Sequence, residues 1–260
     1  MKHSFEYDPA ANAAGEKITI FHVHIPRCAG SALHAALYPC FDEANVIPHH
    51  FGKLADDWRR DRNGPILITG HGSWIASPRE DEKLYYLAVV RDPVERVVSL
   101  YNYVKRTKAH RLYEYIKSRR LKLADLYRFH PVTFRQFHNG QVRHLCTDRY
   151  PLHLGTKQLR ESIDWLGRPN VIVATVETLD RLPGVLSAKF GLPLQGPIPW
   201  IAQSQADADW NNVDEDDLYE AERNTLLDRR LYDFARLGSR EQAKLSAAGA
   251  IRNEAYVGAS

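Results

Sequence analysis

Residues 21–33 read FHVHIPRCAGSAL and combine a strand, a loop of small residues and the start of a helix. The β-branched and aromatic side chains of Lys17–Ile25 predict a buried strand, and Pro26 ends it because proline cannot donate to a sheet ladder. Ala29–Ser31 let backbone N–H groups approach a ligand, and the helix that begins there points its positive end at the same place. With Arg27 beside it, the segment is typical of an oxyanion-binding loop, although a tight connection without a ligand has the same pattern.

Three more apolar runs predict strands, and helices are expected between them. This alternation indicates an α/β protein with a single, mainly parallel central sheet flanked by helices. Ligands of such sheets bind at the carboxyl ends of the strands, where His71 and Arg91 each follow a strand. The runs are Pro65–Gly70, Leu84–Val90 and Asn170–Thr175.

Helices are expected on both sides of these strands. Asp92 is a typical N-cap and Pro93 a typical first-turn residue, so a helix should follow directly after Arg91. We expect residues 1–16 to be a flexible lead-in, 17–237 to form one domain and 238–260 to form a tail that frays. Further helices are predicted at Leu54–Arg62, Val132–His138, Lys157–Gly167, Leu179–Phe190 and Asp214–Leu237.

The composition is that of an ordinary globular protein. Of 260 residues, 44% are hydrophobic and 26% charged, and the net charge of +3 permits an anionic ligand without indicating nucleic acid. The three cysteines form no CxxC pair, which favours a reducing compartment. No apolar stretch approaches the ~20 residues that span a bilayer, and the N-terminus lacks the apolar core of a secretory signal. We therefore expect a soluble, cytoplasmic protein without a transmembrane segment.

The segment Arg91–Tyr101 is the second informative motif. Arg91 lies at a strand end, and Ser99 follows about two turns into the next helix. The two side chains are suited to grip a phosphate from two sides, one with a fork of donors and one with a hydroxyl. The alternative is that Arg91 pairs with a carboxylate and Ser99 is simply a small residue.

Together these motifs resemble those of the carbohydrate sulfotransferases that use 3′-phosphoadenosine-5′-phosphosulfate (PAPS), especially the heparan sulfate 2-O-sulfotransferase branch. His24–Ala32, HIPRCAGSA, is similar to a 5′-phosphosulfate loop that reads approximately HIPKTGGTS in that family. Arg91–Tyr101 matches the 3′-phosphate element RDPxxRxxSxY, and Asn139–Leu145 resembles an NxQxRxL segment. Arg27 stands where the family has lysine, and Cys28–Ser31 replaces Thr-Gly-Gly-Thr.

The resemblance implies a P-loop-NTPase-like sulfotransferase fold and transfer of the sulfuryl group of PAPS to a hydroxyl acceptor. A carbohydrate or glycoconjugate is the expected acceptor, and the scheme requires no metal. The residues that the resemblance assigns to cofactor binding are Arg27, Cys28, Ala29, Gly30, Ser31, Ala32, Arg91, Ser99 and Arg143.

Two residues are candidates for catalysis. In the resembled branch a histidine after the second strand serves as general base, and His71 falls at that place. A neutral imidazole can accept the acceptor's proton near pH 7, whereas a merely structural histidine would bond a loop carbonyl. Arg27, with the loop N–H groups, would neutralise charge on the 5′-phosphate leaving group, because positioning and charge neutralisation dominate such transfers.

Other interpretations are less well supported by the sequence. There is no Walker A motif and no Cys-x5-Arg phosphatase loop, so Cys28 is read as a small loop residue. Neither His22 with His24 nor His49 with His50 has an acid or cysteine nearby to complete a metal site. The basic run Lys105–Lys122 is either a solvated helical face or a surface for an anionic glycan. A nucleotide-dependent kinase and a non-catalytic module that binds anionic glycans are the alternative functions.

Overall fold

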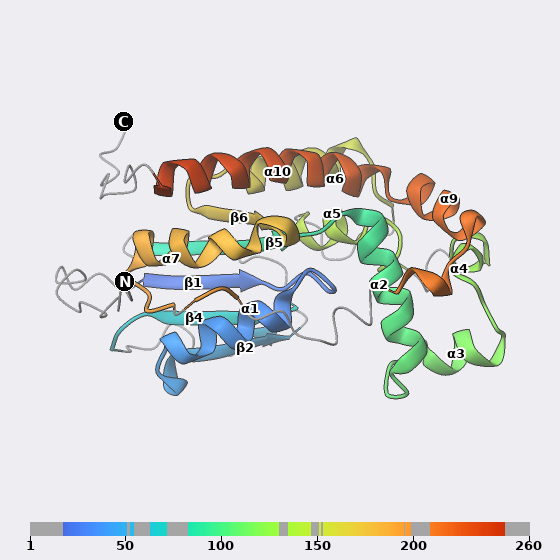
Figure 1. The fold of residues 1–260 in the computed structure, drawn as a ribbon, viewed down its shortest axis with the longest axis horizontal. Helices are drawn as coiled ribbons and strands as arrows, with labels where there is room; N and C mark the ends of the chain where they lie inside the picture. Colours follow the sequence, from blue (N-terminus) through green and yellow to red (C-terminus); the bar gives the residue numbers. More distant parts are fainter. Residues whose placement is uncertain are drawn as a thin grey trace.

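A six-stranded sheet forms the centre of the protein. The computed structural model describes residues 18–50, 53–54, 63–71, 83–129, 135–146, 151, 153–194, 196–198 and 209–247. The strand order is β3-β2-β4-β1-β5-β6, and every neighbouring pair is parallel except β2 with β3, which is antiparallel (Figure 1). The strands are β1 (Ile18–Val23), β2 (Val46–His50), β3 (Lys53–Leu54), β4 (Ile66–Gly70), β5 (Lys83–Val90) and β6 (Val171–Thr175).

Helices cover both faces of the sheet and its carboxyl edge. Short 3₁₀ turns connect several of them, at Tyr38–Cys40, Glu43–Asn45, Val176–Arg181 and Trp210–Asn212. The α-helices are α1 (Gly30–Leu37), α2 (Pro93–Arg106), α3 (Tyr113–Ser118), α4 (Leu123–Phe129), α5 (Gly140–Leu145), α6 (Thr156–Leu166), α7 (Leu182–Phe190), α9 (Glu215–Asn224) and α10 (Leu226–Ala247).

Two hydrophobic cores lie on opposite faces of the sheet, because successive side chains of a strand point to opposite sides. Phe21 of β1 belongs to the core that contains Trp165 of α6 and Leu231 of α10. Its neighbour Ile20 belongs to the other core, with Leu33 of α1 and side chains of α7. Burial of these large apolar side chains is the main favourable contribution to folding.

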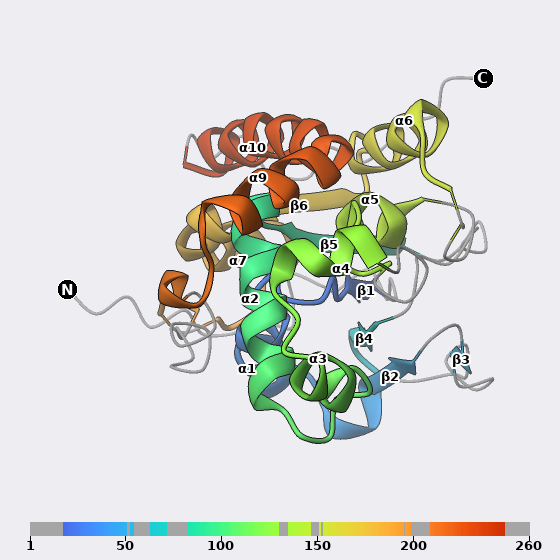
Figure 2. The ribbon, with the colours of Figure 1, turned by 90° about the vertical axis from the view of Figure 1, so that its right-hand side faces the viewer.

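A third core is entirely helical. Val97 of α2, Ile116 of α3, Leu126 of α4 and Ala221 of α9 are buried together in it. These four helices lie beyond the carboxyl ends of the strands and cover that edge of the sheet (Figures 1 and 2). Among the described residues, no helix combines the length and the apolar composition needed to cross a membrane.

The predicted α/β class and the mainly parallel sheet flanked by helices are confirmed. The single long helix predicted at Asp214–Leu237 is wrong, because the backbone leaves the helical conformation at Thr225 (φ −124°, ψ 22°), between α9 and α10. The Thr225 hydroxyl donates to the carbonyl of Ala221 (2.7 Å) at the end of the first helix. Helix α10 then runs to Ala247, into the segment expected to fray.

Two other predicted helices differ from the structure. Leu54 lies in β3 rather than in a helix, and residues 55–62 lie outside the described residues. Of the helix predicted at Val132–His138, residues 132–134 lie outside the described residues, and residues 135–138 form a turn; α5 begins two residues later. For Leu54, pairing with His49 of β2 overrides the helical propensity on which the prediction rested.

Candidate functional site

The carboxyl ends of three neighbouring strands meet at one point. Val23, the last residue of β1, is opposite Gly70 in β4 and Ala88 in β5. The β1–α1 loop, His71 and Arg91 therefore follow strands that lie side by side. Ligands of doubly wound sheets bind at this edge, so the three predicted segments converge where the sequence placed them.

The β1–α1 loop is tight and partly left-handed. Arg27 (φ 70°) and Ala29 (φ 58°) have positive φ angles that residues other than glycine adopt at a cost of about 1 kcal/mol each. Gly30 begins α1 against the ring of His24, and a Cβ at this position would overlap that ring. Backbone strain of this kind is concentrated at functional sites.

Arg27 links the loop to α2. Its Nε donates to Oγ of Ser99 (3.2 Å), and its guanidinium lies 4.7 Å from the centre of the Tyr103 ring. Ser99 is completely buried. The two motifs singled out in the sequence, 72 residues apart, are thus in direct contact.

Arg91 is anchored by its backbone and its side chain. Nε of Arg91 forms a salt bridge with Glu95 (3.2 Å), and its backbone N–H donates to Oε1 of Gln141 (2.9 Å). Pairing with a carboxylate, the alternative weighed for Arg91, is therefore what this structure contains. Asp92 caps α2 as predicted, since its carboxylate accepts hydrogen bonds from the backbone N–H groups of Val94 (3.0 Å) and Glu95 (3.2 Å).

Gln141 joins the two motif-bearing segments and was not among the predicted site residues. Its Oε1 also accepts from the Cys28 thiol (3.4 Å), and its Nε2 donates to the Arg91 carbonyl (2.8 Å). Gln141 is fully buried. The only sequence signal for it is its place in the segment Asn139–Leu145. It fixes the distance between the β1–α1 loop and the start of α2.

Helices α5 and α10 cap each other beneath this link. The Asn139 side chain accepts hydrogen bonds from the first N–H groups of α10, including that of Asp228 (3.0 Å). The Asp228 carboxylate in turn accepts from the N–H groups of Gln141 (3.1 Å) and Val142 (2.8 Å). Burial raises the pKa of Asp228, while Arg96 and these hydrogen bonds act in the opposite direction.

His71 is oriented by the loop. Its Nδ1 lies 3.2 Å from the carbonyl oxygen of His24, and the two rings stack with centres 4.2 Å apart. Since a carbonyl only accepts, Nδ1 is the donor in this hydrogen bond, and in the neutral tautomer that this requires Nε2 is the acceptor nitrogen. A bond to a loop carbonyl is also what the structural alternative for His71 expects, so this geometry is compatible with both roles.

The neighbouring histidines are held uncharged. Burial, with smaller contributions from other histidines, lowers the pKa of His24 to about 2 and that of His22 to about 3. Nδ1 of His22 forms a hydrogen bond with the hydroxyl of Thr69 (2.9 Å). Gly70 between Thr69 and His71 lets β4 approach β2 closely, because a Cβ there would overlap the carbonyl of His49.

The remaining predicted residues have mixed surroundings. Cys28 is buried, which raises the pKa of its thiol to about 12 and keeps it protonated. Ser31 and Ala32 lie in the first turn of α1, Ser31 exposed and Ala32 buried. Arg143 donates to the carbonyls of Arg135 and Pro151, so its guanidinium holds backbone segments. Among the described residues, no three His, Cys, Asp or Glu side chains are grouped as metal ligands.

Neither a protein-family model nor a curated protein matches this chain.

Proposed function

We propose that the protein is a sulfotransferase that moves the sulfuryl group of PAPS to a hydroxyl acceptor. The observation that carries the proposal is the contact between Arg27 and Ser99, which brings the 5′-phosphosulfate-like loop against the 3′-phosphate-like helix. The proposal includes the P-loop-NTPase-like sulfotransferase fold, with β1, the loop and α1 as its phosphosulfate-binding unit. The sequence resemblance supports a carbohydrate as the acceptor.

The donor set at the strand edge fits a ligand with two phosphate groups. The N–H groups at the start of α1, together with Arg27, would bind the 5′-phosphosulfate. Arg91 would bind the 3′-phosphate in exchange for Glu95, its present partner. Arg27 is held by Ser99, and the backbone of Arg91 is held by Gln141, so the spacing of the two residues is set before a ligand arrives.

His71 would act as general base. As the acceptor oxygen bonds to sulfur, its proton passes to Nε2 of His71, because Nδ1 is already bonded to the His24 carbonyl. PAPS, when bound, supplies the sulfuryl group, whose bond to the 5′-phosphate oxygen breaks with the electron pair remaining on that oxygen. Arg27 and the loop N–H groups would stabilise the negative charge left there.

The test is a transfer assay with sulfur-labelled PAPS against glycans, lipids and small alcohols. We expect label to pass to a glycan, with release of 3′-phosphoadenosine-5′-phosphate. ATP turnover without PAPS turnover would replace the proposal with a kinase. Glycan binding by a protein with no affinity for 3′-phosphoadenosine-5′-phosphate would replace it with a non-catalytic glycan-binding module.

A further inference from the structure

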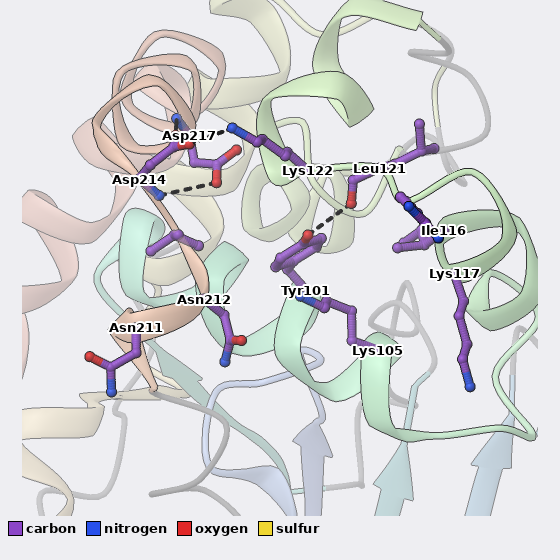
Figure 3. Close-up of a pocket in the computed structure, with 12 residues that line it drawn as sticks. Tyr101, Lys105, Ile116, Lys117, Leu121, Lys122, Asn211, Asn212, Asp214 and Asp217 are labelled. Atoms are coloured by element: carbon purple, nitrogen blue, oxygen red, sulfur yellow. Dashed lines mark hydrogen bonds and ion pairs between the residues drawn. The ribbon is translucent and has the colours of Figure 1, made fainter.

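A second feature lies at the far side of α2, where the basic run of the sequence folds around a pocket. The pocket has a volume of about 640 Å³ and lies between α2, α3 and the segment that leads into α9 (Figure 3). This size falls in the range of small-molecule sites. We call it the basic pocket; its cationic lining residues are Lys105, Lys117, Arg120 and Lys122.

The basic pocket is separate from the strand-edge site. Tyr101, which lines it, lies two residues after Ser99, and that spacing turns about 200° around a helix. Ser99 faces Arg27, so Tyr101 faces away from the β1–α1 loop. A ligand in the pocket would contact the opposite side of α2.

The floor of the pocket is apolar and already satisfied. Tyr101 and Ile116 are buried, 3% and 1% exposed. The apolar surface that a ligand can reach is therefore that of Leu121 and Val213, which are partly exposed. The Tyr101 hydroxyl donates to the carbonyl of Leu121 (2.8 Å), which uses its one hydrogen (Figure 3). An apolar ring is therefore better suited to this floor than a group that needs a hydrogen-bond donor.

The carboxylates of the pocket are already occupied. Asp214 pairs with Lys122 (2.7 Å). The buried Asp217 accepts hydrogen bonds from the backbone N–H groups of Ala124 (2.7 Å) and Asp214 (3.2 Å). Two carboxylates against four cations leave the lining with a positive charge.

Three of the four cations have no carboxylate partner among the described residues. Lys117 donates to the Tyr113 hydroxyl (2.5 Å), and the ammonium of Lys105 lies 4.8 Å from the centre of the Tyr101 ring. Arg120 forms no ion pair with any described residue. These three side chains therefore keep their positive charge without an ion pair among the described residues.

Arg120 occupies a backbone position that favours glycine. It has φ 51° at the end of α3, where the N–H of Leu121 donates to Ile116 (3.0 Å) and its own N–H donates to Lys117 (3.2 Å). This is the Schellman arrangement, whose left-handed residue is usually glycine. The arginine brings a charge to the pocket at the cost of backbone strain.

We infer that the basic pocket binds an organic anion with an apolar ring body and at least two negatively charged groups. The apolar floor would receive the ring, and Lys105, Lys117 and Arg120 would pair with the charges. This inference does not rest on the proposed sulfotransferase activity, because the pocket shares no residue with the strand-edge site.

The test is isothermal titration calorimetry with naphthalene-1,5-disulfonate as the probe. We expect saturable binding that weakens for naphthalene-1-sulfonate and disappears for 1,5-dihydroxynaphthalene. Lys117→Gln combined with Arg120→Gly should raise the dissociation constant about tenfold or more, the loss of two charge-assisted contacts. Lys108→Gln combined with Arg119→Gln removes the same charge from the same basic run, outside the pocket, and should change it less than about twofold.

Equal weakening in both double variants, or no saturable binding, would overturn the inference. Arg120→Gly alone separates binding from folding: its melting temperature should rise, because glycine suits φ 51°, while the probe binds more weakly.

The probe should also bind in the presence of saturating 3′-phosphoadenosine-5′-phosphate. Competition between the two would place the probe at the strand edge and refute a separate pocket. Probe binding by a protein that does not bind the nucleotide would leave the pocket intact and contradict the proposed function alone.

Discussion

Two positively charged regions contact α2 from different sides, and they are built differently. At the strand edge, Arg27 is bonded to Ser99, and Arg91 to Glu95, at distances of 3.2 Å. In the basic pocket, the long side chains of Lys117 and Arg120 are exposed and have no carboxylate partner among the described residues. The first region has fixed geometry, whereas the second has available charge.

The first arrangement suits catalysis, whereas the second suits the binding of anions. A transfer reaction needs groups held in place, and the strand-edge groups are fixed by buried partners such as Gln141. An exposed cationic pocket attracts anions without that precision, and salt screens it. We therefore expect single substitutions at the strand edge to have large effects and those in the basic pocket to have small ones.

The largest effect is expected from His71→Ala. Loss of a general base lowers rates by 10²–10⁴-fold, so the variant should lose about a thousandfold in PAPS turnover, or about 4 kcal/mol. Its calorimetric affinity for 3′-phosphoadenosine-5′-phosphate should stay unchanged. The exposed His153 offers a matched control, and His153→Ala should keep full turnover. Near-normal turnover by His71→Ala would remove His71 as base.

The second-largest expected effect is a loss of folding stability at acidic pH. The pKa values of His22 and His24 in the folded protein, about 3 and about 2, lie well below the unfolded value of 6.5. As pH falls through 6.5, the unfolded chain therefore takes up protons first, and stability present above pH 6.5 is lost. Between pH 7 and 5 we expect urea unfolding to report a loss of about 3–4 kcal/mol from the two histidines.

A substitution at His22 can assign this pH dependence. Asn in the place of His22 keeps a group able to bond to Thr69 and removes the titration. We expect His22→Asn to lose about half as much stability as the wild type between pH 7 and 5. An unchanged pH dependence in this variant would contradict the contribution of His22.

A smaller effect is expected on the affinity for the nucleotide. Arg91→Ala should weaken calorimetric binding of 3′-phosphoadenosine-5′-phosphate about 10- to 100-fold, because a charge-assisted hydrogen bond contributes about 1.5–3 kcal/mol. Glu95→Gln should tighten binding, since Glu95 is the carboxylate with which the phosphate would compete. Unchanged affinity in Arg91→Ala would rule out its assignment to the 3′-phosphate.

The parts of the site that could be predicted are those that depend on the order of elements. Parallel strands bring their carboxyl ends to one edge, so His71, Arg91 and the β1–α1 loop could be placed together from the sequence. Asp92 could be predicted as an N-cap because capping depends on neighbours two and three residues away.

The parts that could not be predicted depend on contacts distant in sequence. Nothing local to Gln141 indicates that it bridges Cys28 and Arg91. The break at Thr225 falls within an amphipathic pattern that reads as one helix, and the second helix begins where the side chain of Asn139 caps it. The basic run was visible, but its grouping around a cavity depends on the turn at Arg120.

The smallest predicted effect concerns folding stability, at the turn that contains Arg120. At φ 51° a residue with a Cβ destabilises the folded state by about 1 kcal/mol relative to glycine. Glycine offsets part of this gain, because it increases the conformational entropy of the unfolded chain. Arg120→Gly should therefore unfold in urea with about 0.5–1 kcal/mol more stability than Arg120→Ala, which keeps the Cβ. Equal stability of Arg120→Ala and Arg120→Gly would show that the turn is unstrained. The left-handed conformation of Arg120 would then no longer support a role for its charge in the basic pocket.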